Sequence, residues 1–191
     1  YGRHIAEVPA FQAGKYLVSN QEFLEFVQAN GYLAENCWEE EGRAWRRHTL
    51  AEYPTFWIRH GNKWRLRVMT EEIPMPWDWP VEVNYHEAKA FCNWKTAATG
   101  QPFRLPTEAE WYRLYDVAGL SEIHHAEPAA ANIHLDHFAS SHPVNEFPQG
   151  EFYDVVGNVW PWTETQIYPF EGFDIHPHYD DLTTPTFDSR H

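Results

Sequence analysis

Large aromatic side chains place the strongest constraint on how this chain can fold. Ten Trp, ten Tyr and twelve Phe stand among 191 residues, together with 14 Pro and 10 Gly, and the mean hydropathy is −0.62. Aromatic rings dominate the cores in which they are buried, whereas Pro and Gly interrupt regular structure. We therefore expect one irregular α+β globular domain with low regular secondary structure, whose core is built from rings.

Capping boxes mark the starts of three predicted helices. In each box a Ser, Asn or Thr stands three positions before a Glu, a spacing that lets the two side chains satisfy each other's backbone N–H groups. The pairs are Ser19 with Glu22, Asn84 with Glu87, and Thr107 with Glu110. The stretch FWIRHGNKWRLRV predicts a β-hairpin around residues 60–62, and residues 120–150 have no strong period, which predicts loop.

The charge is unevenly distributed along the chain. Residues 1–113 carry 15 acids and 13 bases (net −2), and residues 114–191 carry 13 acids and one base (net −12). This acidity argues against nucleic acid as a partner, because phosphates would be repelled. A basic cluster nevertheless occurs, which we interpret as a solvated face on a loop and strand segment, or else as a docking surface. Its members are Arg43, Arg46, Arg47, Arg59, Lys63, Arg65 and Arg67.

The apolar runs and the cysteines of the sequence indicate which cellular compartment to expect. No apolar run approaches the ~18–20 residues of a membrane span, so no membrane partner is expected. Cys37 and Cys92 match neither a disulfide framework nor a metal spacing, and we expect a reduced, cytoplasmic setting. Neither thiol is expected to be activated, because Cys37 lies in an acidic run that would raise its pKa and Cys92 lies on the core face of a helix.

Several motifs carry a resemblance to a known family. In order and spacing these are YLVSNQEFLEFVQANGY, PVEVNYHEAKAFCNW, FRLPTEAEW, HPVNEF and YDVVGNVWPWTET. They are similar to the formylglycine-generating-enzyme-like (sulfatase-modifying-factor) domain, which has a C-type-lectin-like fold. RLPTEAEW together with GNVWPW is a specific pair of motifs, and the resemblance covers nearly the whole chain.

Motifs in the C-terminal third of the chain resemble one particular branch of this family. ANIHLDHFASSHPVNEF, WTETQIYPFEGF and HPHYDDLTTPTFDSRH look like the central domain of the 5-histidylcysteine sulfoxide synthases of ovothiol biosynthesis, to which the ergothioneine-pathway sulfoxide synthases are related. Such oxidoreductases use non-haem Fe(II) and O₂ to join cysteine sulfur to a histidine imidazole carbon as a sulfoxide. The resemblance therefore implies cysteine, histidine and O₂ as substrates.

The resemblance also implies an iron site elsewhere. In the family the iron ligands come from an upstream helical domain carrying H-x-x-x-H-x-E, a string that does not occur here. We therefore expect residues 1–191 to be a single domain, a fragment of a larger enzyme truncated at its C-terminus, with no iron ligand of its own. Its expected partner is that upstream iron-binding domain, and the isolated fragment is expected to be inactive.

Residues after the GNVWPW motif are candidates for the active site. In the family a tyrosine in this segment reaches toward iron and oxygen, and Tyr168 is our candidate, since a phenol can donate a proton; a tyrosine that merely anchors a loop is the alternative. Asp180 or Asp181 is expected to bind the substrate ammonium group, or else to form a solvated turn. Trp160 and Trp162 alternate, so we expect one ring in the core and the other, assigned to Trp162, in the substrate pocket.

A weak calcium site is a further implication of the resemblance. The loop before GNVWPW would use Asp154, and a second loop would use Asn132 and Asp136. Pro161 stands where relatives carry a Glu ligand and offers no side-chain oxygen, whereas calcium takes six to eight oxygen ligands. Calcium binding is therefore expected to be weak at most.

Two other functions remain open at this point. The fold also serves as a non-catalytic lectin-like binding module. A formylglycine-generating oxidase is the second alternative, and that chemistry relies on a pair of reactive cysteines expected downstream of these residues. An upstream H-x-x-x-H-x-E would favour the sulfoxide synthase, whereas its absence would favour the binding module.

Overall fold

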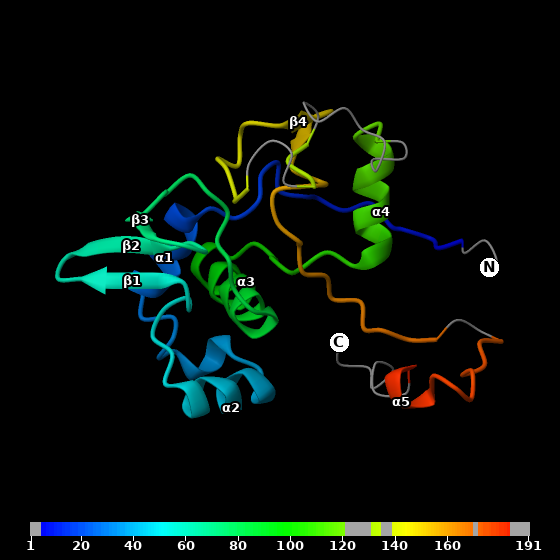
Figure 1. Ribbon diagram of the computed structural model, residues 1–191, viewed down its shortest axis with the longest axis horizontal. Helices are drawn as coiled ribbons and strands as arrows, with labels where there is room; N and C mark the ends of the chain where they lie inside the picture. The colour runs from blue at the N-terminus through cyan, green and yellow to red at the C-terminus, as the bar shows by residue number, and fades with distance from the viewer. Residues whose placement is uncertain (1–4, 121–130, 135–138, 170–171, 184–191) are drawn as a thin grey trace.

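The computed structural model describes residues 5–120, 131–134, 139–169 and 172–183, and within them short helices alternate with two small sheets (Figure 1). The helices are α1 (Asn20–Gln28), the 3-10 helix η1 (Glu35–Cys37), α2 (Glu40–Thr49), α3 (Tyr85–Thr99), α4 (Glu108–Val117) and α5 (Asp180–Thr183). The strands are β1 (Trp57–His60), β2 (Lys63–Arg67), β3 (Glu72–Pro74), β4 (Pro148–Gln149) and β5 (Phe152–Tyr153). Both sheets are antiparallel, in the orders β1-β2-β3 and β4-β5. The predicted α+β class is confirmed.

The three predicted helices begin where their capping boxes place them. Each N-cap side chain accepts a hydrogen bond from the N3 backbone N–H, and each N3 glutamate accepts one from the N-cap backbone. The predicted hairpin is formed by β1 and β2, with Gly61 in the left-handed region (φ 59°) at its turn. None of the helices in the described part of the chain is long and apolar enough to cross a membrane.

Helix α2 corrects the expectation for part of the basic cluster. Arg43, Arg46 and Arg47 lie on this helix, not in a loop or strand. Its N-cap makes no side-chain hydrogen bond, and it ends at Leu50 in the left-handed conformation (φ 55°) without a glycine. Helix α2 therefore lacks a side-chain N-cap and a terminal glycine, although acidic residues in its first turn and basic residues in its last turn suit the helix dipole.

The core between α1, α3 and the three-stranded sheet is built from rings, as the composition predicts. Phe23 packs against Phe26 and Phe91 with ring centroids 5.3 Å apart in each pair, and Trp57 lies edge-on to Phe23 at 6.4 Å. The buried residues of this cluster all lie between Phe23 and Phe91. The first half of the chain therefore has a continuous aromatic core.

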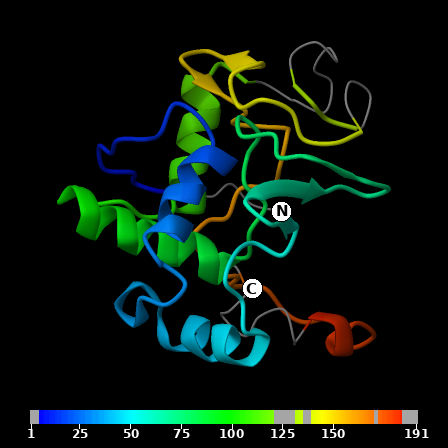
Figure 2. The ribbon, with the colours of Figure 1, turned by 90° about the vertical axis from the view of Figure 1, so that its left-hand side faces the viewer.

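The second half packs beside this core. Trp111 on α4 donates its indole N–H to the Val155 carbonyl at 3.0 Å, and the backbone N–H of Tyr153 donates to Lys15 at 3.0 Å. In Figures 1 and 2, α2 lies at the lower end of the molecule and the β4-β5 ribbon at the upper end. The chain thus forms two neighbouring parts, one around α1–α3 and one around α4 and β4-β5.

Candidate functional site

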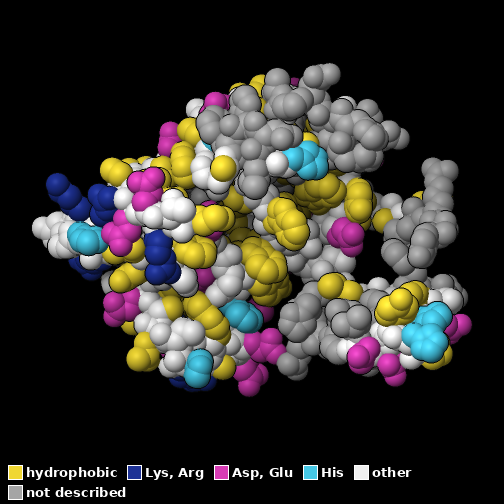
Figure 3. All heavy atoms as spheres, viewed as in Figure 1, with side chains coloured by type: hydrophobic (Ala, Val, Ile, Leu, Met, Phe, Trp, Pro, Cys, Tyr) yellow, Lys and Arg dark blue, Asp and Glu magenta, His cyan; other side chains and the backbone are white. Residues whose placement is uncertain are grey.

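A cleft of about 2020 Å³ lies between the two parts of the molecule. Its walls come from the segment before α1, from α3 and α4, and from residues 101–106 and 152–162. Small-ligand pockets usually measure ~300–1000 Å³, so the cleft has room for more than one small substrate. Figure 3 shows hydrophobic side chains gathered near the middle of the viewed face. This cleft is the candidate active site.

Two ion pairs lie along the cleft. Arg104 donates to both carboxylate oxygens of Glu110, at 2.7 and 2.6 Å, and Lys95 pairs with Glu22 at 2.8 Å. The hydrogen bonds from Arg104 and the Thr107 backbone N–H outweigh burial and lower the pKa of Glu110 to about 2. Each cation in these two pairs thus has its charge matched by a carboxylate.

Glu87, in the wall of the cleft, is a buried carboxyl whose hydrogen-bond donors are neutral groups. Tyr32 donates its hydroxyl to one oxygen of Glu87 at 2.5 Å, and the Asn84 backbone N–H donates to the other at 2.9 Å. Burial raises the pKa of Glu87 despite these two donors, and burial together with the nearby carboxylate raises that of Tyr32. The pair joins the start of α3 to the loop after α1.

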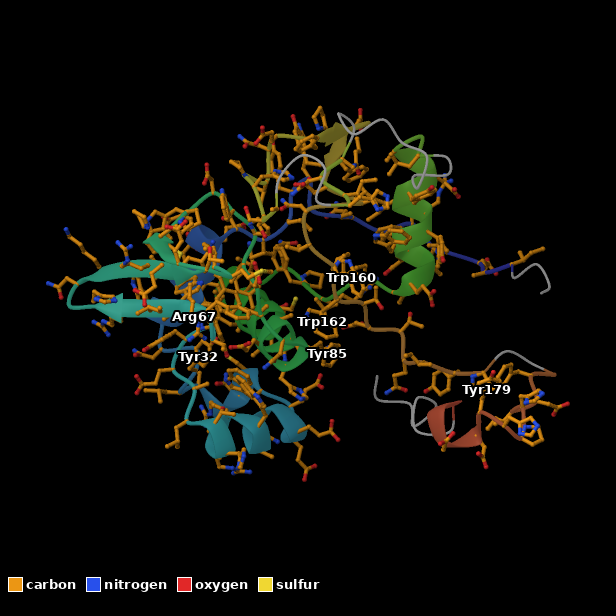
Figure 4. The ribbon with its side chains drawn as sticks, in the orientation of Figure 1. Tyr32, Arg67, Tyr85, Trp160, Trp162 and Tyr179 are labelled. Atoms are coloured by element: carbon orange, nitrogen blue, oxygen red, sulfur yellow. The ribbon has the colours of Figure 1, made fainter. Side chains whose placement is uncertain are left out.

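The two tryptophans of the GNVWPW motif both line the cleft (Figure 4). Trp162 donates its indole N–H to the Val83 carbonyl at 2.9 Å, and its ring meets that of Tyr85 edge-on at 6.0 Å. Trp162 is 47% exposed and Trp160 98% exposed. The expectation that one of these rings enters the core is therefore wrong, because the turn at Gly157 (φ 97°) and Asn158 (φ 64°) directs the following segment across the cleft.

The segment after Trp162 is anchored on both parts of the molecule. The Glu164 carboxylate pairs with Lys89 of α3, and its backbone N–H donates to Pro106 at 2.8 Å. The Thr165 hydroxyl accepts from the Glu108 backbone N–H at 2.8 Å, at the start of α4. These contacts hold the chain against α3 and α4 as far as Thr165.

Beyond Thr165 the chain leaves the body as an arm, defined here as residues 166–169 and 172–181 (Figure 1). Tyr168 is 59% exposed and donates its hydroxyl to the side chain of Gln166. Asp180 and Asp181 are exposed at the start of α5, where the Asp181 backbone N–H donates to the Asp180 carboxylate at 2.8 Å. The structure thus places Trp162 in the cleft and the other three candidate residues in the arm.

Two of the three predicted calcium ligands lie in one corner of the cleft. Asn158 links them, because its side chain donates to Asp154 at 3.1 Å and its backbone N–H donates to the Asn132 carbonyl at 3.0 Å. The other Asp154 oxygen faces His142 Nε2 at 3.4 Å, and burial raises the pKa of Asp154 to about 6. The two oxygens of Asp154 that a calcium ion would need therefore already face the Asn158 amide and the His142 imidazole. Asp136 lies outside the described residues, and calcium binding here stays a prediction.

The cysteines and histidines offer no metal centre in the part of the chain that is described. Burial raises the pKa of Cys37, and it raises that of Cys92 to about 11. The absence of an activated thiol is thus as expected, although burial and not the neighbouring acids accounts for Cys37. No three His, Cys, Asp or Glu side chains of the described residues come together in a way that could hold a metal ion. The described residues therefore do not fit an iron site.

The capped helices, the two small antiparallel sheets and the cleft beside the GNVWPW turn define an α+β domain of the sulfatase-modifying class. Residues 2–176 match the family described as the sulfatase-modifying factor enzyme 1-like domain. This match covers most of the chain, and the chain belongs to that family.

The proteins similar to this chain include hercynine oxygenases, formylglycine-generating enzymes and an inactive form of the latter. The chain is 32% identical over 197 residues to a hercynine oxygenase of Mycolicibacterium smegmatis, an alignment that covers 97% of the chain and 44% of that protein. It is 30% identical to the formylglycine-generating enzyme of Bos taurus, over 82% of the chain and 49% of that protein. An inactive Cα-formylglycine-generating enzyme 2 of Bos taurus is 26% identical over 83% of the chain. The chain spans 44% and 49% of the length of the first two of these proteins and 61% of the third.

Proposed function

We propose that the chain is the central domain of an iron- and O₂-dependent oxidoreductase, a sulfoxide synthase that joins cysteine sulfur to the imidazole of histidine, as in ovothiol biosynthesis. The observation that carries this proposal is the similarity to three hercynine oxygenases at 31–34% identity, compared with 27–30% for three formylglycine-generating enzymes. The choice of histidine as substrate rests on the resemblance of the C-terminal third of the sequence.

The proposed reaction balances with O₂ as the only oxidant. The thiol S–H and one imidazole C–H are broken, a C–S bond and an S–O bond are formed, and the second oxygen atom leaves as water with the two hydrogens. The substrates lose four electrons and O₂ takes them up. Fe(II) would supply the activation of O₂, and its ligands would come from a helical domain outside these residues.

In this proposal, residues of the chain bind and orient the substrates. Trp162 lies in the cleft wall beside Tyr85, where it can cover an imidazole ring. Asp180 or Asp181 would accept hydrogen bonds from the substrate ammonium group, and Tyr168 would hold a proton on its phenol oxygen for transfer during turnover. Tyr168, Asp180 and Asp181 lie on the exposed arm, so the arm would contact the active centre once the upstream domain is present.

The test uses the whole protein that carries this chain, loaded with Fe(II) and supplied with O₂, cysteine and histidine. Mass spectrometry would measure the histidyl-cysteine sulfoxide made by the wild type and by Tyr168→Phe. Tyr179→Phe is the matched control, since Tyr179 is a 57% exposed tyrosine of the same arm. We expect a 10²–10⁴-fold loss of sulfoxide formation for Tyr168→Phe, the range of general acid catalysis, and no loss for the control.

Other outcomes of this experiment would correct the proposal. Equal yields from both variants would remove Tyr168 from the active site and leave the reaction in place. Product from hercynine but not from histidine would move the protein to the ergothioneine-type reaction. An iron-loaded protein that forms no sulfoxide from either substrate would favour a non-catalytic binding module, a role consistent with the similarity to a relative named as inactive.

A further inference from the structure

We propose that Glu87 is a positioning residue for the substrate pocket. Its carboxyl group, anchored by Tyr32, holds the Trp162 ring in the cleft through the single peptide group that joins Val83 to Asn84. The inference deepens the proposed function and rests on it for the substrate that Trp162 would cover. The hydrogen bonds that carry the inference do not depend on any reaction.

One peptide group connects the Glu87 carboxyl to the Trp162 ring. Its N–H, from Asn84, donates to Glu87 Oε2 at 2.9 Å. Its carbonyl, from Val83, accepts the indole N–H of Trp162 at 2.9 Å. Hydrogen bonds in such a chain polarise one another, so a strong acceptor at the N–H makes the carbonyl a stronger acceptor as well. The strength of the Trp162 contact therefore depends on Glu87.

Glu87 is itself held in one orientation. Tyr32 donates its hydroxyl to Glu87 Oε1 at 2.5 Å, and the Asn84 side chain accepts the Glu87 backbone N–H at 2.9 Å. Glu87 and Tyr32 are each only 2% exposed, so water does not replace these contacts. The carboxyl group therefore cannot turn away from the Asn84 N–H without losing the hydrogen bond from Tyr32.

A second contact at the start of α3 fixes the tilt of the Trp162 ring. Tyr85, the first residue of α3, meets this ring edge-on with centroids 6.0 Å apart (Figure 4). Tyr85 directly follows Asn84, the N-cap that Glu87 holds through the capping box. The carbonyl of Val83 thus places the indole nitrogen, and Tyr85 places the face of the ring. Both contacts depend on the same helix start.

Helix α4 holds the same segment in a parallel way. The Thr107 N–H donates to Glu110 at 2.8 Å, and the Pro106 carbonyl, at the other end of that peptide group, accepts the Glu164 N–H at 2.8 Å. This second chain of hydrogen bonds ends on the backbone of the segment, whereas the chain from Glu87 ends on a side chain that lines the cleft. Of the two capping-box glutamates, Glu87 is therefore the one assigned to the ring.

The test uses the whole protein that carries this chain, labelled with 5-fluorotryptophan. The ¹⁹F resonance of Trp162 is identified by its loss in Trp162→Phe. Glu87→Gln keeps an oxygen acceptor but removes the charge, and hydrogen bonds to a charged acceptor are about twice as strong as neutral ones. We expect the Trp162 resonance of this variant to move toward the shift of fluorotryptophan in water.

Two further variants keep the test decisive. Tyr32→Phe leaves the carboxyl group in place but removes its anchor, so it should move the Trp162 resonance in the same direction by a smaller amount. It also decides the outcome should Glu87→Gln fail to fold. Ser19→Ala removes the N-cap side chain of α1, a loss of the same kind in another capping box, and should leave the Trp162 resonance unchanged.

Kinetics then connect the ring to the substrate. With Fe(II), O₂ and cysteine supplied, Glu87→Gln should raise the KM for histidine about three- to tenfold and leave kcat within about twofold, because a binding contact is weakened. In the Trp162→Phe background the same change should alter the KM by less than about twofold, since the ring that Glu87 positions is gone.

The outcomes separate the positioning of Trp162 from the proposed function. An unchanged Trp162 resonance in both Glu87→Gln and Tyr32→Phe, or an equal shift in Ser19→Ala, would overturn the inference. Equal effects of Glu87→Gln on the KM with and without Trp162 would do the same. A protein that forms no sulfoxide while its Trp162 resonance shifts as expected would refute the proposed function and support the positioning role of Glu87.

Discussion

Two glutamates that occupy the same position of a capping box have side-chain pKa values shifted in opposite directions. Glu87 and Glu110 are each the third residue of a helix, and each accepts a hydrogen bond from the N-cap backbone N–H. Arg104 donates to both oxygens of Glu110 and holds its pKa well below the usual value, whereas Glu87 has Tyr32 as its side-chain donor and its pKa rises through burial. The sequence motif predicts the cap in both helices, but the charge of the side chain depends on residues that the motif does not contain.

Glu110→Gln is expected to reduce stability near neutral pH. The folded-state pKa is about 2, below the ordinary 4.5, so the ionised side chain stabilises the fold above pH 4.5, and this contribution is lost as the pH falls from about 4.5 to about 2. The difference in Tm between wild type and variant should therefore be largest near neutral pH and shrink in acid. Glu108→Gln, an exposed change in the same helical turn, should show no such trend. A Tm difference independent of pH would contradict this assignment.

Tyr32→Phe tests the buried hydrogen bond at the start of α3. The change removes the hydroxyl that donates to Glu87 at 2.5 Å and leaves a buried carboxyl oxygen without that donor. We expect the free energy of unfolding to fall by about 1–3 kcal/mol, measured by urea denaturation. Tyr112→Phe, at a tyrosine that is 56% exposed, serves as the control and should cost less than about 0.5 kcal/mol. Equal losses for both would mean that this hydrogen bond contributes nothing specific.

The helices differ in how far the sequence predicts them. Ser19, Asn84 and Thr107 begin their helices with side-chain caps, and Gly100 ends α3 in the left-handed conformation, so local chemistry suffices for α1, α3 and α4. Helix α2 has neither a side-chain N-cap hydrogen bond nor a terminal glycine, and it is held by tertiary contacts such as that of Trp45 with the His86 ring of α3, with ring centroids 6.4 Å apart. Contacts of this kind have no signature in a single sequence, so the sequence predicts a loop and strand for the basic cluster and misses this helix.

Leu50→Gly should stabilise the end of α2. Leu50 adopts φ 55°, a conformation that costs a non-glycine residue about 1–3 kcal/mol, and its side chain is 80% exposed, so little packing is lost. We expect a gain of about 0.5–1 kcal/mol in the free energy of unfolding by urea denaturation. Thr49→Gly, one residue earlier and inside the helix, should instead lose up to about 1 kcal/mol. The same sign for both changes would contradict the predicted role of the backbone conformation.

At the scale of the whole molecule, the sequence predicts the class of fold but not the cleft or the arm. The walls of the cleft meet through contacts between distant residues, such as the Trp162 indole with the Val83 carbonyl and Trp111 with Val155. Aromatic composition predicts that rings form the core, yet it does not distinguish the buried Trp57 from the exposed Trp160. The candidate residues of the active site came from family resemblance, and their role in catalysis stays a prediction.

Lys89→Met should loosen the attachment of the arm. The ammonium group joins α3 to Glu164 and, at 3.6 Å, to Glu39, and the side chain is only 17% exposed. Its loss leaves Glu164 without this ion pair and should cost about 1 kcal/mol, together with faster cleavage near residue 165 in limited proteolysis. Arg47→Met, an exposed change on α2, should alter neither measurement. Unchanged proteolysis of Lys89→Met would show that the backbone hydrogen bonds of Glu164 and Thr165 suffice.

The part of the molecule around α1–α3 has more buried apolar side chains than the part around α4 and β4-β5. The contiguous ring cluster ends at Phe91, and Ala131, Phe147 and Val155 are buried outside it. Amide protons of α1 and α3 should therefore exchange with deuterium only on global opening, whereas those around α4 and β4-β5 exchange through a cheaper, partial opening. Heating would then melt the α4 side first, so the Tm compared for Glu110→Gln is that of the lower transition, and the α1–α3 unit melts in the upper one.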